Sequence, residues 1–509
     1  MIAKVFTSIP YGFNGRIIEV ECAITQGLPQ FDIVGMANKT VSEARQRVRN
    51  AIKNSGLKWP DSHITINLAP AEIAKDGNFF DVPIAISILV ASNQLLESDV
   101  KNCIFSGELS LSGKIRAVRG IINILEAGKS RGFKTFFIPI TNLPQADLID
   151  NIKVIGINTL LDLVLLLKHQ LKPTISKHKH VVKNNKTDSD TILLSDICGQ
   201  EIAKKALITA VAGRHNIILS GPPGAGKTML AHAAINLMPK LSKTEIIEVT
   251  KIHGLSGESN VISSRPFRSP HHTSTILSLI GGGPKSIPGE ISLAHLGVLY
   301  LDELPEYPRA TLESLRQPLE DKKITISRVN SHFSYPCDFM LLATMNPCPC
   351  GYLGDKTHEC KCKNFEIQRY RNKLSGPLLD RIDIRINIER TKTSELRTQS
   401  LASSKALEDA QNCQNVVKNN ITDAIVRQHA RYGNANTFNA NLTSTEVVRY
   451  IKLSSSARSL LEEASERLKL SARSYFKIIK VAQTIADLNK SDLVDVSHIA
   501  EALSYHSDL

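Results

Sequence analysis

The sequence predicts an α/β protein with a parallel sheet at its centre, preceded by a second mixed α/β domain and followed by a helical tail. Three observations lead to this prediction. An apolar run ends in a glycine-rich turn at Gly221, and a helical pattern follows it. Strand and helix patterns then alternate to about residue 390, which is typical of a parallel sheet covered by helices. From residue 443 onward, apolar residues recur at helix spacing.

Length and composition narrow the class of protein. The 509 residues correspond to about three domains, and 42% hydrophobic with 22% charged residues is ordinary for a globular chain. No run approaches the roughly 18 uncharged apolar residues of a membrane span, and the first residues lack the pattern of a signal peptide. We therefore expect a cytoplasmic protein with no membrane partner, whose nine cysteines are reduced or metal-bound. The formal charge of +13 weakly favours a nucleic-acid partner.

Residues 1–167 predict a compact α+β domain. Ile64–Leu68 is typical of a short strand and Val82–Leu95 of an apolar helix. Residues 105–118 alternate and turn at Gly113, which indicates a hairpin. The apolar run Leu160–Leu167 predicts a helix that closes the domain.

A basic segment, residues 168–190, follows. It holds six lysines and two aspartates, a net charge of +4, and few apolar residues. This composition predicts a solvated linker. A basic tether that touches DNA is the alternative, because lysines attract phosphates without sequence preference.

Residues 191–390 predict the parallel-sheet domain, which carries the candidate site. Residues 391–442 are polar and rich in Asn, Gln and Ser, which indicates a flexible or helical connector. Residues 443–509 predict a helical lid with helices over Ser454–Leu468, Ser471–Leu488 and Val496–Ser504.

A phosphate-binding loop directly follows the first strand of the parallel-sheet domain. The motif G-x-x-x-x-G-K-[ST] is complete, and it lies between an apolar strand and a helical pattern. Glycines let backbone N–H groups converge on phosphate oxygens at the positive end of the helix. We therefore expect ATP here, with the lysine on the β- and γ-phosphates and the threonine hydroxyl on Mg²⁺. The residues are Gly221, Pro222, Pro223, Gly224, Ala225, Gly226, Lys227 and Thr228.

Two later strands end in polar residues that suit ATP hydrolysis. The apolar run from Val298 ends in Asp302 and Glu303. Asp302 is placed to hold Mg²⁺ through water, and Glu303 to act as general base toward the attacking water. The strand from Phe339 ends in Asn346, whose amide would orient that water. Two solvated acids at a strand end, and a turn-forming asparagine before a proline, are the structural alternatives.

Four cysteines fall within 15 residues in the pattern C-x-C-x₉-C-x-C. Reduced thiols on two short turns suit tetrahedral Zn²⁺, although the spacing is tighter than the usual C-x₂-C pairs. Four thiolates leave no open position for water, so the predicted site is structural, and we expect it to brace the loop that leads to Arg381. Four incidental cysteines are the alternative, and His358 is a possible replacement ligand. The residues are Cys348, Cys350, Cys360 and Cys362.

These motifs together resemble the ComM/YifB family of magnesium-chelatase-like AAA+ ATPases. The resemblance covers nearly the whole chain and depends on several long, specific motifs. They are GPPGAGKT, RPFRSPHHT (residues 265–273), GEISLAH (289–295), VLYLDELPE (298–306), LRQPLED (315–321), MNPCPCG (345–351), SGPLLDRIDI (375–384) and SARSYFKIIKVAQTIADL (471–488).

The resemblance implies roles that spacing alone does not give. Asn346 matches the sensor-1 residue, Arg381 the arginine finger that acts on a neighbouring subunit, and Arg473 the sensor-2 arginine of the lid. From spacing alone, both arginines are ordinary surface residues. The family implies a homohexameric ring that moves along DNA and promotes branch migration, with helicase action, in recombination during natural transformation.

The N-terminal domain resembles the proteolytic domain of Lon proteases, which has the fold of ribosomal protein S5. The segment Ala74–Phe79 matches the Lon segment that ends in the catalytic serine, and here that position holds Phe79. The position of the Lon catalytic lysine corresponds to Ile122. Since neither a nucleophile nor its amine base is present, we expect no peptidase activity.

Candidate DNA contacts lie on two insertions of the parallel-sheet domain. Lys285 belongs to a flexible, glycine-rich segment, and residues 321–328 predict a β-hairpin with Lys322, Lys323 and Arg328. In related ring ATPases such insertions face the central pore, where lysines contact backbone phosphates of single- or double-stranded DNA. A solvated hairpin is the alternative for any one of these residues.

Two other classes of function remain open from the sequence. A chelatase-like chaperone would remodel a protein partner without touching DNA. A regulatory scaffold would bind ATP and use the Lon-like domain for interaction, although the intact Glu303 disfavours it. ATP hydrolysis with and without DNA separates the three.

Overall fold

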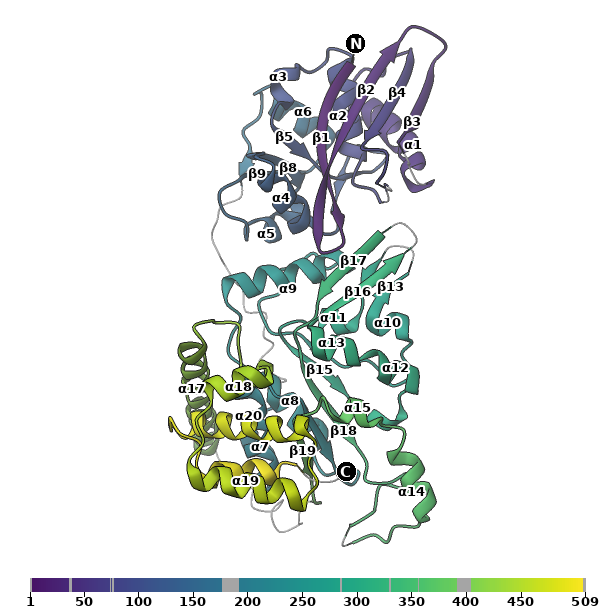
Figure 1. Ribbon diagram of the computed structural model, residues 1–509. Helices are drawn as coiled ribbons and strands as arrows, with labels where there is room; N and C mark the ends of the chain where they lie inside the picture. Colours follow the sequence, from purple (N-terminus) through teal and green to yellow (C-terminus); the bar gives the residue numbers. More distant parts are fainter. Residues whose placement is uncertain are drawn as a thin grey trace.

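The computed structural model describes residues 2–35, 39–73, 75, 77–175, 192–283, 286–328, 331–355, 357–390 and 404–506. Within these ranges it has an N-terminal α+β domain, a central α/β domain and a C-terminal group of helices (Figure 1). Most of the basic linker, from residue 176, and the first part of the connector, residues 391–403, lie outside the described residues. No helix of the described part is long and apolar enough to cross a membrane.

The N-terminal domain is built on an eight-stranded sheet with the order β10-β9-β8-β5-β1-β2-β4-β3. Its strands are β1 (Ile2–Tyr11), β2 (Asn14–Thr25), β3 (Gln30–Val34), β4 (His63–Ala69), β5 (Cys103–Phe105), β8 (Thr135–Pro139), β9 (Lys153–Ile157) and β10 (Thr174–Ile175). The helices are α1 (Lys39–Asn54), α2 (Asp81–Ala91), α3 (Glu97–Val100), α4 (Ile121–Ser130), α5 (Leu143–Ala146) and α6 (Leu160–Leu167).

Several elements of this domain confirm the sequence prediction. β4 and α6 occupy the expected segments, and β6 (Glu108–Leu109) pairs with β7 (Ile115–Arg116) as an antiparallel hairpin. Every residue of α2 is buried, which its nearly continuous apolar sequence explains. α2 ends at Ala91 rather than at Leu95, because Asn93 adopts a left-handed conformation (φ 58°) that a helix cannot continue through.

The central domain has a five-stranded sheet with the order β12-β15-β18-β11-β19, and all its neighbouring strands are parallel. The strands are β11 (Ile217–Ser220), β12 (Phe267–Arg268), β15 (Val298–Leu301), β18 (Met340–Met345) and β19 (Ile384–Asn387). The helices are α7 (Glu201–Gly213), α8 (Lys227–Leu237), α9 (Lys243–Ser256), α10 (Ile276–Ile280), α11 (Glu290–Leu293), α12 (Arg309–Ser314), α13 (Arg316–Asp321), α14 (Asn364–Arg371) and α15 (Gly376–Leu379). Two hairpins are inserted, β13 (Gly281–Gly282) with β14 (Ile287–Pro288), and β16 (Lys323–Arg328) with β17 (Ser331–Pro336).

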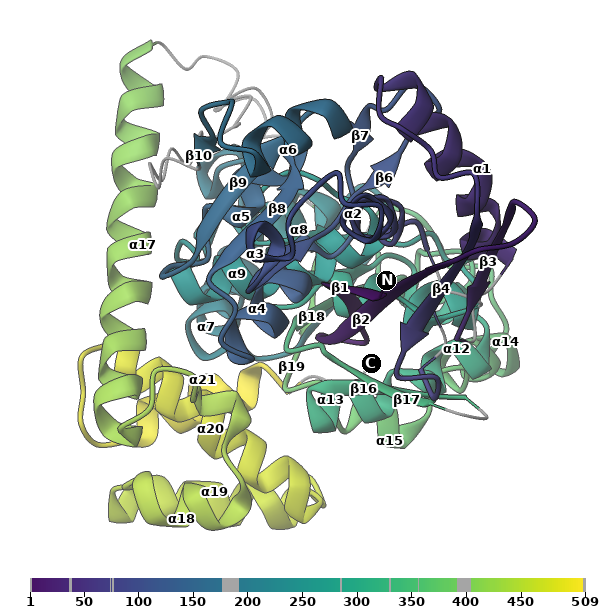
Figure 2. The same ribbon diagram turned by 90° about the horizontal axis from the view of Figure 1, so that it is seen from above.

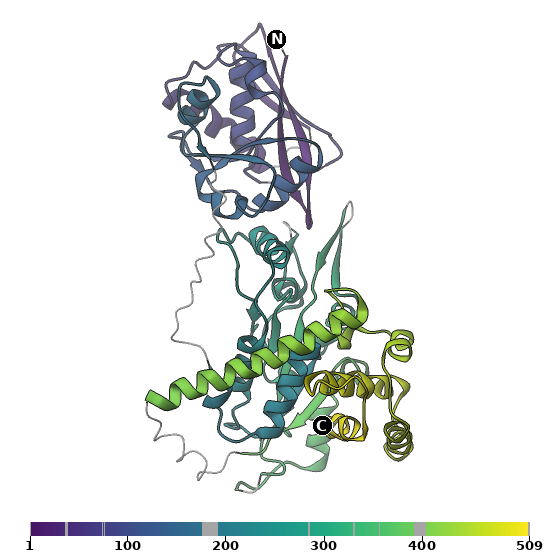
Figure 3. The same ribbon diagram turned by 90° about the vertical axis from the view of Figure 1, so that its left-hand side faces the viewer.

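The C-terminal helices are α17 (Ser404–Tyr432), α18 (Ser444–Tyr450), α19 (Ser455–Arg467), α20 (Ala472–Leu488) and α21 (Val496–Ser504). The last four begin directly after a side-chain cap, which satisfies N–H groups that a helix start leaves unpaired. The caps are Thr443, Ser454, Ser471 and Asp495. Within its described residues, the predicted connector is largely the long helix α17, which runs along the outside of the molecule (Figures 2 and 3).

A buried polar network fixes α20 to the central sheet. His215, fully buried just before β11, contacts Asp383 through Nδ1 at 3.2 Å and Thr484 of α20 through Nε2 at 2.8 Å. Lys477 of α20 donates to the carbonyl of Ile382 at 3.0 Å. Burial alone would raise the pKa of Asp383, but the hydrogen bond from His215 lowers it to about 2. The helical lid and the sheet therefore share one core in this structure.

The N-terminal domain packs on α9 and on the β16–β17 hairpin (Figure 1). The backbone N–H of Gly120 donates to the carbonyl of Gly254 at 3.0 Å. Lys251 forms an ion pair with Glu126 at 2.5 Å and lies 4.2 Å from the ring centre of Phe13. On the hairpin, the ring of Phe333 meets that of Tyr11 edge to face at 4.9 Å between centroids.

Candidate nucleotide-binding site

The carboxyl ends of three neighbouring strands bring the predicted ATP-site residues to one edge of the central sheet. β11 pairs with β18 so that Ser220 lies opposite Met345, and β15 pairs with β18 so that Leu301 lies opposite Ala343. The residues that follow these strand ends are the P-loop, Asp302 with Glu303, and Asn346. Ligands bind at this edge in open parallel sheets.

The P-loop needs glycine for two different reasons. Gly224 (φ 77°) and Gly226 (φ 82°) adopt left-handed conformations, although nothing lies within 4 Å of a Cβ at either position. Gly221 is restricted by space, because a Cβ there would lie 2.5 Å from the carbonyl oxygen of Ile388. α8 then begins at Lys227, so its unpaired N–H groups face the loop. This cradle fits the phosphate groups of a nucleotide.

Lys227 is held over the loop by oxygen atoms. Its Nζ donates to the carbonyl oxygens of Gly221 and, at 3.2 Å, of Pro222, and to Oδ1 of Asn346 at 2.9 Å. Burial lowers the pKa of this amine to about 8, while Asp302 and Glu303 act in the opposite direction. The two residues that the sequence assigns to phosphate binding and water orientation are therefore in direct contact.

The two carboxylates differ in their surroundings. Asp302 accepts a hydrogen bond from the hydroxyl of Thr344 on β18, and the same hydroxyl accepts one from the backbone N–H of Glu303 at 3.2 Å. Glu303 adopts a left-handed conformation (φ 50°), and its side chain is exposed. The hydroxyl of Tyr300 lies 3.5 Å from that of Thr228 and also interacts with Asp302, so one side chain connects the two expected Mg²⁺ ligands. Hydroxyl and carboxylate oxygens are suitable ligands for Mg²⁺.

The two arginines lie at the opposite edge of the sheet. The carbonyl of Arg381 accepts from Asn216, which precedes β11, whereas the P-loop follows the other end of the same strand. Arg381 pairs with Glu320 of α13, and Arg473 of α20 pairs with the same carboxylate at 3.3 Å. The four residues of β11, with a rise of about 3.3 Å each, therefore separate the backbone of Arg381 from the start of the P-loop of its own chain by roughly 13 Å.

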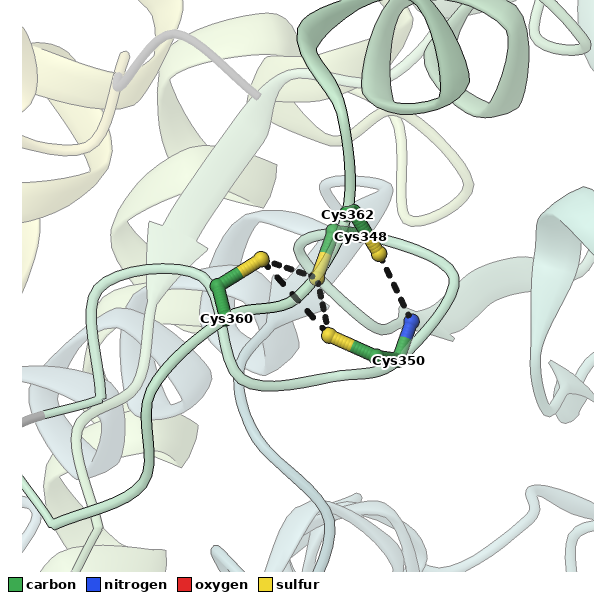
Figure 4. Close-up of side chains that lie close together, drawn as sticks. All are labelled: Cys348, Cys350, Cys360 and Cys362. Atoms are coloured by element: carbon green, nitrogen blue, oxygen red, sulfur yellow. Dashed lines mark hydrogen bonds between the residues drawn. The ribbon is translucent and has the colours of Figure 1, made fainter.

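The four cysteines converge as the sequence predicts (Figure 4). Their sulfur atoms all lie within 4.8 Å of one another, and the sulfurs of Cys348, Cys350 and Cys360 are 3.3 to 3.6 Å apart. Tetrahedral Zn²⁺ with thiolates at 2.3 Å places sulfurs about 3.8 Å apart, so the donor set fits this metal. The backbone N–H of Tyr352 is the main cause that lowers the pKa of Cys350 to about 6, whereas burial and the neighbouring cysteines raise the pKa values of Cys360 and Cys362.

The cysteine loop contacts the P-loop, and it also adjoins the segment that leads to Arg381, because Tyr370 of α14 interacts with Cys348 and with the backbone of Asn346. Gly351 (φ 86°) packs so closely that a Cβ there would lie 2.8 Å from Cδ of Pro223. Farther along the loop, His358 and Thr357 contact Arg390 beyond β19, at 3.0 and 3.4 Å. The expectation that this loop braces the segment leading to Arg381 stays a prediction, and the contact of Gly351 with Pro223 adds a brace on the phosphate-binding side.

The candidate DNA contacts have different environments. Lys322, at the base of the β16–β17 hairpin, pairs with Asp338 at 3.0 Å, so its charge is already engaged. Lys323 is exposed, and Arg328 is the last residue of β16, next to the hairpin turn. Lys285 lies outside the described residues. Their contact with DNA stays a prediction.

In the N-terminal domain, the resemblance to Lon proteases equates Phe79 and Ile122 with the catalytic pair, and both side chains lie in apolar surroundings. Ile122 is 1% exposed, and Phe79 packs against the core cluster that contains Ile122 and against a second core cluster.

Sequence reasoning missed three other residues, Thr344, Glu320 and Gly351. Thr344 has a signal in the sequence, because it is the one polar residue of the apolar strand MLLATM. The pairing of Glu320 has none, because it depends on residues 61 and 153 positions away.

A complete P-loop at the end of a central parallel strand, with acidic and asparagine residues on the next strands and a helical lid, defines a P-loop ATPase of the AAA+ class. Family models agree with this assignment. "Magnesium chelatase, subunit ChlI" matches residues 193–396, "Subunit ChlI of Mg-chelatase" residues 20–142, and "Magnesium chelatase, subunit ChlI C-terminal" residues 411–506.

Full-length relatives narrow the class. The chain is 41% identical over 514 residues to competence protein ComM of Haemophilus influenzae, and 39% identical over 515 residues to the uncharacterized protein YifB of Escherichia coli. Each alignment covers 99% of this chain and 97% of the relative. Lon protease 2 of Bacillus subtilis is 29% identical over 200 residues, or 35% of each chain. The chain belongs to the ComM/YifB family of magnesium-chelatase-like AAA+ ATPases.

Proposed function

We propose that this protein is an ATP-hydrolysing motor that works as a homohexameric ring on DNA. One observation carries the proposal. Lys227, Asp302, Glu303 and Asn346 meet at one edge of the sheet, while Arg381 and Arg473 lie at the other. A subunit with the two halves of an ATP site on opposite edges completes the site only with a neighbour, and repetition of that contact closes a ring.

The residues would divide the hydrolysis of ATP as follows. The glycine amides of the P-loop and Lys227 bind the phosphates, and Thr228 and Asp302 hold Mg²⁺, which neutralises charge on the phosphate oxygens when bound. Glu303 accepts a proton from the attacking water, and Asn346 orients that water. Arg381 and Arg473 of the neighbouring subunit stabilise the charge that develops on the terminal phosphate, an effect worth about 10³–10⁵ in rate for an arginine finger.

DNA is the proposed track. The relative from Haemophilus influenzae is named a competence protein, and the family resemblance implies work on incoming DNA during recombination. The formal charge of +13, the exposed Lys323 and the position of Arg328 beside a hairpin turn suit contacts to phosphates without sequence preference. We therefore propose branch migration, with helicase action, during natural transformation as the work that ATP hydrolysis drives in the cytoplasm.

Zinc is proposed as a structural metal of the same site. Cys348, Cys350, Cys360 and Cys362 would hold it, leaving no position for water. Because Asn346 lies two residues before Cys348, and Gly351 packs on Pro223, a bound zinc would fix the turn that places Asn346 beside Lys227.

The test is the ATPase rate with and without a forked or four-way DNA. We expect DNA to stimulate hydrolysis by the wild-type protein, and Glu303→Gln to abolish hydrolysis while ATP still binds. Glu306→Gln is the matched control, because Glu306 is an exposed acid three residues further on that pairs with Lys373. A wild-type protein that neither binds DNA nor responds to it would contradict the motor and favour a chaperone that acts on a protein partner.

A further inference from the structure

One carboxylate joins the two arginines that the proposed function assigns to the neighbouring subunit's ATP. Oε2 of Glu320 accepts a hydrogen bond from Nη2 of Arg381, and Oε1 accepts one from Nη2 of Arg473 at 3.3 Å. The three residues come from α13, from the turn after α15 and from the first turn of α20. Each oxygen of the carboxylate therefore serves a different arginine.

The backbone around each of these side chains is fixed. Nη1 of Arg381 donates to the carbonyl of Pro377 at 2.6 Å, and its own carbonyl accepts from Asn216 at 2.9 Å. The α20 helix that carries Arg473 is held to the adjoining segment by Lys477, which donates to Ile382 at 3.0 Å. The helix α13 that carries Glu320 is fixed as well, because Leu319, the neighbour of Glu320, is buried in the core beneath the β16–β17 hairpin. The meeting point is thus a property of the folded core rather than of three free surface side chains.

The side chains of the two arginines and of Glu320 differ in their exposure to solvent. Arg381 is only 11% exposed, whereas Arg473 is 44% and Glu320 is 52% exposed. Two guanidinium groups repel each other unless an anion lies between them. The hydrogen bond from Arg381 is the main cause that lowers the pKa of Glu320, so this anion is present throughout the neutral pH range. A terminal phosphate presents the same feature, several anionic oxygens that can accept from both arginines at once.

We propose that Glu320 is a positioning residue, which holds Arg381 and Arg473 together as one donor pair that each subunit presents to its neighbour's terminal phosphate. This inference rests on the proposed function. Glu320 itself touches no nucleotide, and its effect passes entirely through the two arginines.

Steady-state kinetics give the first test. In Glu320→Gln the side chain keeps one acceptor oxygen but turns an NH₂ group toward the other guanidinium, so the pair separates. Because misplaced catalytic groups lose much of their effect, we expect kcat for ATP to fall about tenfold or more. KM should stay within about twofold, since the neighbour's P-loop binds the nucleotide, and the arginine pair acts on the charge that develops in the transition state. Glu320→Asp, which keeps both anionic oxygens, should recover part of the rate.

The matched control is Glu463→Gln. Glu463 lies on α19, and its exposed side chain pairs with a single arginine, Arg467, at 2.7 Å. This variant should keep the wild-type kcat. A second readout is whether the effects of two substitutions on kcat add. If both substitutions disrupt the same arginine pair, their effects are not additive. In an Arg473→Ala background, Glu320→Gln should therefore lower kcat by less than it does in the wild-type protein.

Rings assembled from two kinds of variant subunit show on which subunit Glu320 acts. Lys227→Ala subunits lack a working P-loop but keep their arginines, whereas Arg381→Ala subunits keep the P-loop. Mixing the two should restore hydrolysis at the shared interfaces. Adding Glu320→Gln to the Lys227→Ala subunits should lower this restored rate about tenfold. Adding it to the Arg381→Ala subunits, whose arginine pair is already broken, should change the restored rate by less than twofold.

Three results would overturn the positioning role. They are an unchanged kcat in Glu320→Gln, a rise in KM equal to the fall in kcat, and an equal loss whichever subunit carries the change. Mass photometry of each variant separates these from failure to assemble. Failure of the proposed function has another signature, a wild-type protein without ATP hydrolysis or mixed rings that show no restoration.

Discussion

Lys227 donates a hydrogen bond to the side-chain oxygen of Asn346 at 2.9 Å, and this contact joins the start of α8 to the end of β18. The two residues lie 119 positions apart in the sequence. Their meeting depends on the parallel pairing of β11 with β18, which brings both strand ends to the same level.

Asn346→Ala removes the group that orients the attacking water. We expect kcat for ATP to fall about 10²-fold, the loss typical of one positioned polar group at a reaction centre, with little change in nucleotide affinity. Steady-state ATPase measurements check this. Asn387→Ala is the matched control, because Asn387 ends the edge strand β19 of the same sheet and its side chain is exposed. Equal losses in both variants would contradict the assigned role.

The depressed pKa of Lys227 predicts a pH-dependent affinity for ATP. In the free protein its amine, with a pKa of about 8, is protonated at pH 7 and mostly neutral at pH 9. A bound phosphate requires the charged form, so binding at high pH includes proton uptake, and affinity falls as pH rises. We expect Kd for a non-hydrolysable ATP analogue to weaken about tenfold between pH 7 and pH 9.

Lys227→Arg is the control for that measurement, since a guanidinium stays protonated over the whole range. Its affinity can be lower overall, but the slope with pH should be lost. A pH dependence that is the same in both proteins would show that another group titrates.

Metal analysis tests the cysteine loop. Freshly purified protein should contain about one zinc per chain, and Cys360→Ser should lose it, because a serine hydroxyl is a poor replacement for a thiolate ligand. The loop that carries Asn346 should then loosen, and kcat should fall with it. Cys413→Ser is the matched control, since Cys413 is exposed on α17, far along the chain from the cluster. Well under one zinc per chain in the wild-type protein would remove the zinc hypothesis.

Two ion pairs between the N-terminal domain and α9 should differ in strength. Lys251 is 7% exposed in its pair with Glu126, while Lys243 and Asp150 are 46% and 53% exposed. A double-mutant cycle with Lys251→Met and Glu126→Gln should give a coupling of about 1 kcal/mol, because Glu126 is partly screened by water. The same cycle at Lys243 and Asp150 should give about zero. Chemical unfolding measures both, and equal couplings would contradict the role of burial.

The sequence predicted what depends on local pattern. The P-loop, the strand before Asp302 and the helices Leu160–Leu167 and Val496–Ser504 follow from apolar periodicity and turn residues, and the structure confirms them. The convergence of four sulfurs followed from two closely spaced pairs and the chemistry of thiolates. At these positions local preference and the fold agree, which is typical of natural sequences.

Contacts over long sequence distances were not predictable in this way. Nothing in the pattern around Glu320 points to Arg381 or Arg473, and the docking of Gly351 on Pro223 depends on how two loops meet above the sheet. The pairing of Lys322 with Asp338 likewise follows from the closure of the hairpin base, where Cys337 donates to the carbonyl of Lys322. Tertiary packing decides such contacts, and composition carries little information about them.

The most direct test of the motor is the movement of a labelled four-way DNA junction. We expect the wild-type protein to release a product strand only with ATP and Mg²⁺, and Glu303→Gln to bind the junction and ATP without releasing any strand. A wild-type protein that hydrolyses ATP at full rate and leaves the junction unmoved would contradict the account.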